Sequence, residues 1–306
     1  MIAKCGCIMI AARGIPAEAG EGEDMTILRN GLAVVAIAGA LFAACGVQAE
    51  ETLLERGTYL MRAIVACGNC HTPKGPEGEL PGMELAGWAE IESNPAFTAS
   101  APNITPDPET GIGGWTDRQI IDAIREGRRP DGSIIGPPMP IALYRGLSDR
   151  DAQAIVAYMR QVEPARNAVP KSVYNIPLPP AYGPPVATVP EPDREDRLAY
   201  GAYLAGPAGH CIECHSPMGP KGPDWENRLG AGGLEFHLPF GTVVSTNITP
   251  AGIGDYSDAE VQRMIREGVR PDGSKMLPPM PYGYYANISD PDMDAIIAFL
   301  RSLPER

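Results

Sequence analysis

The strongest constraint on the fold of this 306-residue chain is that much of it occurs twice. The strings GTYL (57–60), CGNCH (67–71) and NITP (103–106) recur, closely or identically, as GAYL, CIECH and NITP 144 positions later. The strings REG (125–127), RPDG (129–132) and PPMP (137–140) recur 141 positions later. A period this long indicates a tandem duplication of a domain, since solenoid repeats span about 20–50 residues. Each copy is long enough to enclose one small core.

The repeat divides the chain into two expected domains, 50–163 and 193–306. The connection between them, residues 164–192, contains nine prolines. Such a segment favours an extended polyproline conformation and acts as a semi-rigid spacer. It could instead be pinned across the surface of a domain, and the sequence leaves both arrangements open.

The first 49 residues read as a leader that is removed from the mature protein. An apolar run at 31–47 follows Arg29 and ends in Val47-Gln48-Ala49, which resembles a secretory cleavage site. Met25 gives a better start than Met1, because residues 18–24 are acidic. We therefore expect export to the periplasm. An uncleaved membrane anchor and lipidation at Cys45 are the alternatives.

Composition narrows the class of protein further. The 33 Pro and 35 Gly interrupt nearly every run, which argues against a sheet of long strands. Gly shows no period of three, which excludes collagen, and a 44% apolar share argues against full disorder. The net charge of −13 excludes nucleic acid as an expected partner and favours docking to a basic protein surface.

Each copy predicts a mainly α domain built from short helices and long loops. The first helix is expected over Thr52–Ala66, with Leu53, Leu60 and Ile64 on its inner face. A second begins with a capping box at Thr116 and ends at Gly127, and a third follows Ser148. The matching signals in the second copy are Ser257, Gly268 and Ser289. Residues 71–114 are expected to form a long Gly/Pro-rich loop, so something other than three short helices must fill the centre.

The CxxCH strings supply that filling. Two thiols one helical turn apart can add to the two vinyl groups of a porphyrin, and the following His then reaches the iron. Cys67, Cys70 and His71 would hold one covalent haem c. A second haem would be held by Cys211, Cys214 and His215. With the leader removed, these four are the only cysteines that remain.

A sixth iron ligand should be duplicated as its haem is. Met139 and Met280 lie in identical Pro-Pro-Met-Pro contexts, and a thioether donor raises the reduction potential of a haem. Met276 is the competitor, but its counterpart in the first copy is Ile135. His210 and His237 lack counterparts in the first copy, and His210, next to Cys211, is expected to be a surface or haem-edge residue.

Other interpretations of these motifs remain open. The two CxxC pairs could together form a tetrahedral zinc site, and a thioredoxin-like redox pair would need a βαβ context that is not evident. Several matched pairs could contact haem or serve as turn and surface residues: Asn103 and Asn247, Arg129 and Arg270, Trp115 and Tyr256, Tyr144 and Tyr285. Arg118 and Arg160 are expected to lie on solvated helix faces.

Over residues 52–306 the chain resembles a two-haem class I cytochrome c. Its strings NITPD, TGIG, WTD, AIREG, RPDG, PPMP and LSD are similar to the cytochrome c subunits of periplasmic alcohol, aldehyde and nicotinate-type dehydrogenases. The resemblance implies a non-catalytic subunit that passes electrons from a dehydrogenase catalytic subunit to a cytochrome, an oxidase or a quinone-linked complex of the respiratory chain. Related subunits often carry three haem domains. A dihaem redox enzyme resembling thiosulfate dehydrogenase or a peroxidase is the alternative, and a haem domain that only docks the chain to a partner is a third possibility.

Overall fold

The computed structural model describes residues 50–306 apart from 221 and 239–240, and the expected leader lies outside the described residues. In the first copy the helical elements are α1 (Leu53–Tyr59), the π-helical turn η1 (Leu60–Ile64), α2 (Gly68–His71), α3 (Asp117–Glu126), α4 (Ile141–Tyr144) and α5 (Asp149–Gln161). In the second copy they are α6 (Arg197–Tyr203), η2 (Leu204–Ala208), α7 (Cys211–Cys214), α8 (Trp225–Arg228), α9 (Pro250–Ile253), α10 (Asp258–Glu267), α11 (Tyr282–Tyr285) and α12 (Asp290–Ser302). None of the helices in this part of the chain is long and apolar enough to cross a bilayer.

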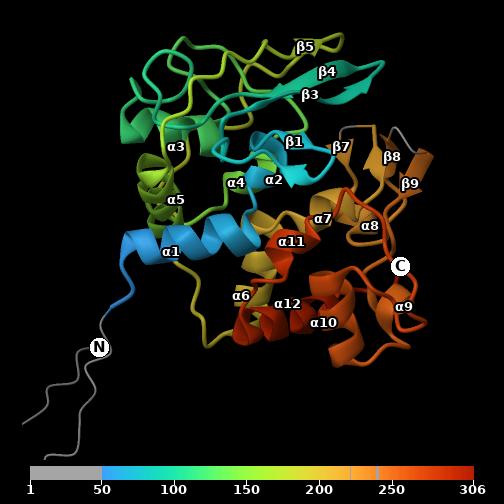
Figure 1. Ribbon diagram of the computed structural model, residues 1–306. Coiled ribbons are helices and arrows are strands. Elements are labelled where there is room, and N and C mark those ends of the chain that lie inside the picture. Colours follow the sequence, from blue (N-terminus) through green and yellow to red (C-terminus); the bar gives the residue numbers. More distant parts are fainter. Residues whose placement is uncertain (1–49, 221, 239–240) are drawn as a thin grey trace, which may run out of the picture. The chain divides into compact units, whose positions relative to one another are not determined.

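The two longest helical crossings are built in the same way. Helix α1 packs on α5, and α6 packs on α12 (Figure 1). At Gly57 an added Cβ would lie 2.0 Å from the carbonyl oxygen of Ala154, and at Gly201 it would lie 2.0 Å from that of Ala295. Only glycine therefore permits the close approach of each pair of helices, which explains why it recurs in both copies.

The predicted helix boundaries are confirmed at the caps. Thr116 begins α3 with a reciprocal capping box to Gln119, and Gly127 ends it in the left-handed conformation with φ 64°. Ser257 and Gly268 do the same for α10. Hydroxyls at Ser148 and Ser289 cap α5 and α12. These signals are local, so the sequence carries them without knowledge of the tertiary structure.

The predicted inner face of the first helix is wrong at one position. Leu60 and Ile64 are fully buried, but the side chain of Leu53 is 39% exposed. The buried side of α1 is formed by Arg56 and Gly57 instead. Arg56 is buried because it pairs with Asp151, a residue 95 positions away that a helical pattern does not reveal.

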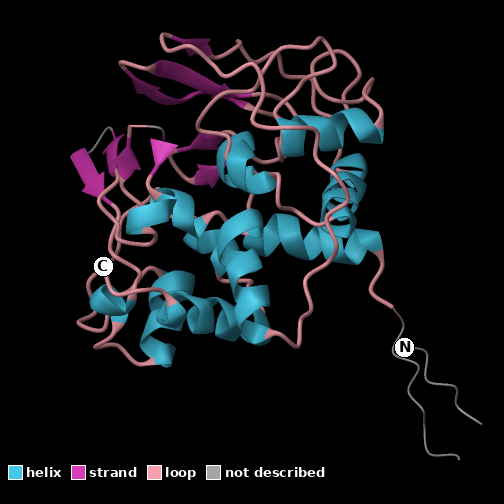
Figure 2. Ribbon diagram, turned by 180° about the vertical axis from the view of Figure 1, so that it is seen from behind, coloured by secondary structure: helices cyan, strands magenta, loops and turns pink. Residues whose placement is uncertain are grey.

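The expected loop at 71–114 is also wrong in part, because it contains four strands. They are β1 (Lys74–Gly75), β2 (Gly78–Glu79), β3 (Trp88–Asn94) and β4 (Phe97–Ala101), and β5 (Val173–Tyr174) extends the second hairpin. The second copy has β6 (Met218–Gly219), β7 (Gly222–Pro223), β8 (Glu235–Leu238) and β9 (Gly241–Val244). All pairs are antiparallel and short, and Figure 2 shows the strands apart from the main group of helices.

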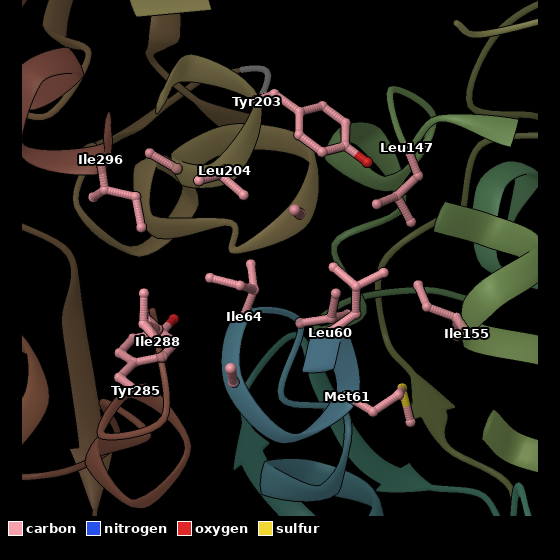
Figure 3. Packing of buried hydrophobic residues seen from close by; sticks show 14 of the residues in the cluster. Leu60, Met61, Ile64, Leu147, Ile155, Tyr203, Leu204, Tyr285, Ile288 and Ile296 are labelled. Carbon is pink, nitrogen blue, oxygen red and sulfur yellow. The ribbon is translucent and has the colours of Figure 1, made fainter. Parts of the chain in front are cut away.

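The hydrophobic core is shared by the two copies. Leu60 and Ile64 of η1 face Leu204 of η2, and side chains of α5 and α12 complete the same cluster (Figure 3). Two tyrosines, Tyr59 partly buried and Tyr203 buried, make matching hydrogen bonds across this interface. Tyr59 Oη donates to Asp292 Oδ2 at 2.7 Å, and Tyr203 Oη donates to Asp151 Oδ2 at 2.5 Å. The two halves therefore pack as one body within the described chain.

The proline-rich connection is pinned to the first copy. Asn103 Nδ2 donates to Ala165 O at 2.6 Å, and Tyr182 Oη donates to Ile135 O at 2.8 Å. Further along, Asp149 N donates to Val189 O at 2.9 Å. Of the two arrangements that the sequence leaves open, the structure has the one in which the segment follows a protein surface.

Candidate functional site

Each CxxCH segment forms a single helical turn. The two cysteines and the histidine therefore lie on one turn of the backbone. In the first copy His71 N donates to Cys67 O at 2.9 Å, and in the second His215 N donates to Cys211 O at 3.0 Å. His71 is buried, and Cys67 packs against the hydrophobic cluster. The turn fits the spacing that attachment of a porphyrin through two thiols requires.

Each imidazole is held through one of its nitrogens by a backbone carbonyl. His71 Nδ1 lies 2.8 Å from Pro102 O, and His215 Nδ1 lies 2.7 Å from Thr246 O. Because a carbonyl oxygen can only accept, Nδ1 carries the proton in both rings and Nε2 presents its lone pair. Burial lowers the pKa of both imidazoles, so both rings are held in the neutral form that binds a metal.

The residue directly before each repeated NITP string supplies the carbonyl. Pro102 and Thr246 each precede the asparagine of the string. Asn103 Oδ1 accepts from the amide and hydroxyl of Thr105 at 2.9 and 2.7 Å, and Asn247 Oδ1 accepts from those of Thr249 at 2.8 Å each. Both asparagines are therefore turn residues that fix the backbone beside the histidine, which answers a question that the sequence left open.

The two Met loops also match in their backbone. A cis peptide bond joins Pro137 to Pro138 and Pro278 to Pro279, immediately before each methionine. Met139 O accepts from the amide of Ile141 at 2.8 Å, and Met280 O accepts from that of Tyr282 at 3.0 Å. Both methionine side chains are partly buried against the hydrophobic cluster.

In the second copy three of the four candidate haem-binding residues line one cavity, and Cys214 is not among them. It contains about 960 Å³ of unfilled space, part of it open to solvent. Cys211, His215 and Met280 lie on its wall together with apolar side chains of α9, α10 and α12, among them Ile253, Val261 and Leu300. A largely apolar cavity with two ligand types of this kind fits a haem. Met276 and Met264 line it as well, so the choice of Met280 depends on the repeat and not on the cavity alone.

The four thiols do not converge on a tetrahedral zinc site. Across the described residues, the only group of three or more metal-binding side chains consists of His210, Glu213 and Cys214, and it contains one thiol. Burial raises the pKa of Cys67 to about 12 and that of Cys211 to about 11, which favours the protonated thiols. The group around Glu213 is part of the second attachment segment.

His210 and Tyr144 form a contact between the copies that the sequence did not predict. The ring of Tyr144, at the end of α4, meets the imidazole of His210 edge-on with centroids 5.9 Å apart. Burial lowers the pKa of His210 to about 4. Tyr285, the counterpart of Tyr144, lines the cavity, and its hydroxyl donates to Gly209 O at 3.2 Å. The side chain of His237, by contrast, is 65% exposed.

The arginines fall into three groups: turn residues, surface residues, and a matched pair that bonds the chain before a helix, Arg160 and Arg301, here called the arginine clasp. Arg129 and Arg270 bond the backbone of their own turns, at Ile134 O and Lys275 O, and Arg270 also lines the cavity. Arg118 is exposed as expected. The expectation for Arg160 is wrong, because its guanidinium is only 28% exposed and donates to Trp115 O at 2.5 Å and to Asp117.

Arg301 makes the same contacts in the second copy, with Tyr256 O and Asp258. Sequence reasoning missed this pair, although Arg160 and Arg301 are related by the 141-residue offset that identified the other matches. Trp115 and Tyr256 thus each accept a backbone hydrogen bond from a partly buried arginine, and Tyr256 also lies on the cavity wall.

Comparison with known proteins agrees with this chemistry. Residues 52–159 match the family model of cytochrome c oxidase, cbb3-type, subunit III. A diheme cytochrome c-type protein of Cereibacter sphaeroides is 30% identical over 300 residues, which cover 90% of this chain and 98% of that protein. The cytochrome c subunit of a quinone-dependent alcohol dehydrogenase of Gluconacetobacter polyoxogenes is 31% identical over 285 residues, or 84% of this chain and 57% of that subunit. A fructose dehydrogenase cytochrome subunit of Gluconobacter japonicus is 31% identical, with 84% and 54% covered.

The fold and the donor set define a protein built to hold covalent haem. The chain belongs to the family of c-type cytochromes that includes these dehydrogenase subunits and the diheme protein. It spans slightly more than half the length of the alcohol dehydrogenase subunits that it matches.

Proposed function

We propose that the chain is an exported dihaem cytochrome that passes electrons from a dehydrogenase catalytic subunit to an acceptor of the respiratory chain. The observation that carries the proposal is the duplicated histidine geometry, in which a backbone carbonyl accepts from Nδ1 of both His71 and His215. Two copies that each hold a metal group would need this same ligand orientation twice. The near-full-length similarity to a diheme protein supports the count of two.

Each copy would use its residues in the same roles. The thiols of Cys67 and Cys70, and those of Cys211 and Cys214, would bind the porphyrin edge. The histidines would bind iron through Nε2, and Met139 and Met280 would each supply a thioether ligand. A haem with these ligands supplies one-electron transfer at a raised reduction potential. The matched caps, glycine crossings and clasps support a tandem duplication with domains at 50–163 and 193–306.

The chain's own residues would fix the orientation of the iron ligands. The carbonyls of Pro102 and Thr246 hold the imidazole rings. Because both sites have a candidate sixth ligand, neither is built to bind substrate at iron. The alternative of a dihaem redox enzyme is therefore not favoured.

Partners and location follow from the same proposal. The relatives bear the names of cytochrome subunits of alcohol, fructose and gluconate dehydrogenases, which favours a dehydrogenase as electron donor. The acceptor would be a cytochrome, an oxidase or a quinone-linked complex. The net charge of −13 favours basic docking surfaces and an association rate that falls with added salt.

An optical spectrum of the ferric holoprotein tests the iron ligands. His/Met ligation predicts a far-red thioether-to-iron charge-transfer band with an amplitude for two haems, and no change on adding peroxide at neutral pH. A spectrum without that band, or rapid binding of peroxide by the resting protein, would contradict the proposal and favour the enzyme alternative.

A further inference from the structure

The two Met loops differ in what covers them, although their own backbones match. In both copies the residue four positions before the methionine donates to the glycine that ends the preceding helix. Ile135 N bonds Gly127 O at 2.7 Å, and Met276 N bonds Gly268 O at 2.7 Å. The difference therefore lies outside the loops, in the chain that packs on them.

The first loop is covered by two tyrosines of the connection 164–192. Tyr182 Oη donates to Ile135 O at 2.8 Å, and Tyr174 Oη donates to Pro137 O at 3.1 Å. Both acceptors lie within the five residues that end at Met139. These bonds hold the carbonyls on either side of Gly136.

Packing reinforces the two hydrogen bonds. A Cβ at Gly136 would lie 2.6 Å from the Tyr174 ring and 2.7 Å from the Leu178 side chain, so the connection lies directly on the loop. The Tyr182 ring would lie 2.9 Å from a Cβ at Gly127. Strand β5, which contains Tyr174, is itself fixed by pairing with β4, as Figure 1 shows. The cover is thus anchored to the same half of the chain as the loop.

The second loop is more open at the matching position. Leu277 is the counterpart of Gly136, and its side chain is 54% exposed. In the first copy the ring of Tyr182 packs on Gly127. In the second copy the ring of Tyr282 packs on the matching Gly268, with ring atoms 3.0 Å from an added Cβ. Tyr282 begins α11, directly after the loop, and its hydroxyl donates to Leu277 O at 3.4 Å within the same segment. The second loop has one long side-chain bond from elsewhere, from Asn69 Nδ2 to Pro279 O at 3.5 Å, where the first loop has two shorter bonds from tyrosines.

We propose that Tyr174 and Tyr182 are positioning residues for Met139. They clamp residues 135–139 so that the first iron keeps its thioether ligand more firmly than the second iron does. This inference rests on the proposed His/Met ligation. A ligand that competes with the thioether can bind only when the loop opens, so its apparent affinity scales with the open fraction.

Imidazole titration of the ferric holoprotein tests the clamp. A Met280→His background removes the second thioether from the far-red band and leaves the first loop as the only one observed. In that background Tyr174→Phe and Tyr182→Phe should each tighten apparent imidazole binding by about fivefold, because each removes one hydrogen bond but keeps the ring. Val173→Ala is the matched control, since Val173 lies in the same strand and its side chain is 61% exposed. Affinities within twofold of the control would overturn the proposal.

Hydrogen exchange gives a readout that does not depend on the ligand at iron. The amide of Ile135 should exchange more slowly than that of Met276, and the two Phe substitutions should narrow the difference. Equal exchange at the two amides in the unmodified holoprotein would overturn the clamp. If the far-red band is absent from the unmodified protein, the proposed ligation fails while the exchange comparison still tests the clamp. If the band is present but neither readout responds to the substitutions, only the clamp fails.

Discussion

Tyr203 donates a hydrogen bond from its hydroxyl to Oδ2 of Asp151, 2.5 Å away in the other copy. Asp151 is fully buried and also accepts two bonds from Arg56, at 2.7 and 2.9 Å. The counterpart of Asp151 is Asp292, which accepts from Tyr59 at 2.7 Å, but the counterpart of Arg56 is Tyr200. The two halves thus share the tyrosine-to-aspartate bond and differ in the buried ion pair.

This difference predicts unequal costs for removing the two carboxylates. Asp151→Ala leaves the guanidinium of Arg56 buried without its partner and should lower the free energy of unfolding by about 3–5 kcal/mol. Asp292→Ala loses a hydrogen bond to a neutral tyrosine and should cost about 1–2 kcal/mol. Denaturant unfolding of the two holoproteins measures both values. Equal losses would mean that the Arg56 pair has no special weight in the interface.

The same tyrosines predict a loss of stability at alkaline pH. Burial and the nearby carboxylates raise the pKa of Tyr59 and of Tyr203 above the ordinary value of about 10. A raised pKa means that the folded state holds the proton more tightly, so the contribution is complete below about pH 10 and falls as pH rises further. Unfolding free energies measured across that range should decline, and the Tyr59→Phe/Tyr203→Phe double variant should decline less steeply. A double variant with an unchanged slope would show that other groups cause the decline.

The arginine clasp predicts a contrast between two arginines of the first copy. Arg160→Ala removes bonds to backbone oxygens next to α3 and should cost about 1–2 kcal/mol. Arg118→Ala removes an exposed pair within α3 and should change stability by about 0.5 kcal/mol or less. Thermal unfolding of the two variants gives the comparison. A larger loss for Arg118→Ala would reverse the assignment of the two residues.

The axial ligands can be tested one at a time. Met139→His and Met280→His should each remove about half of the far-red band and lower the potential of one haem by at least about 0.1 V, within the range of about 0.8 V that axial ligands span. Spectroelectrochemistry resolves the two potentials. Turnover of the assembled dehydrogenase complex should slow in both variants if both haems lie on the electron route. Unchanged turnover in one variant would assign its domain to docking alone.

Local signals in the sequence predicted the features that depend on neighbouring residues. The capping box at Thr116 and the left-handed Gly127 could be predicted because each involves residues a few positions apart. Strand β3 could not be predicted, because its glutamates interrupt the alternation of apolar and polar residues. Glu90 also adopts a positive φ of 51° where the register of the strand pair shifts. Other features depend on contacts between residues far apart in sequence, which a hydrophobic periodicity does not reveal. They are the exposure of Leu53, the Arg56–Asp151 pair and the path of the segment that contains Tyr174 and Tyr182.

At the candidate site, the repeat gave the residue types and the structure gave their orientation. The spacing of Cys67, Cys70 and His71 predicted the chemistry. It did not indicate that Pro102 O would hold His71 Nδ1, because that bond joins two segments 31 positions apart. The second copy repeats this bond between His215 Nδ1 and Thr246 O, so the same arrangement occurs at both CxxCH segments.

The number of covalent haems in the exported holoprotein tests the central proposal most directly. Intact mass spectrometry together with a haem assay should give two haems per chain, and Cys67→Ala/Cys70→Ala should leave one. A single haem in the unmodified protein, or two in the double variant, would contradict the assignment of one haem to each CxxCH segment.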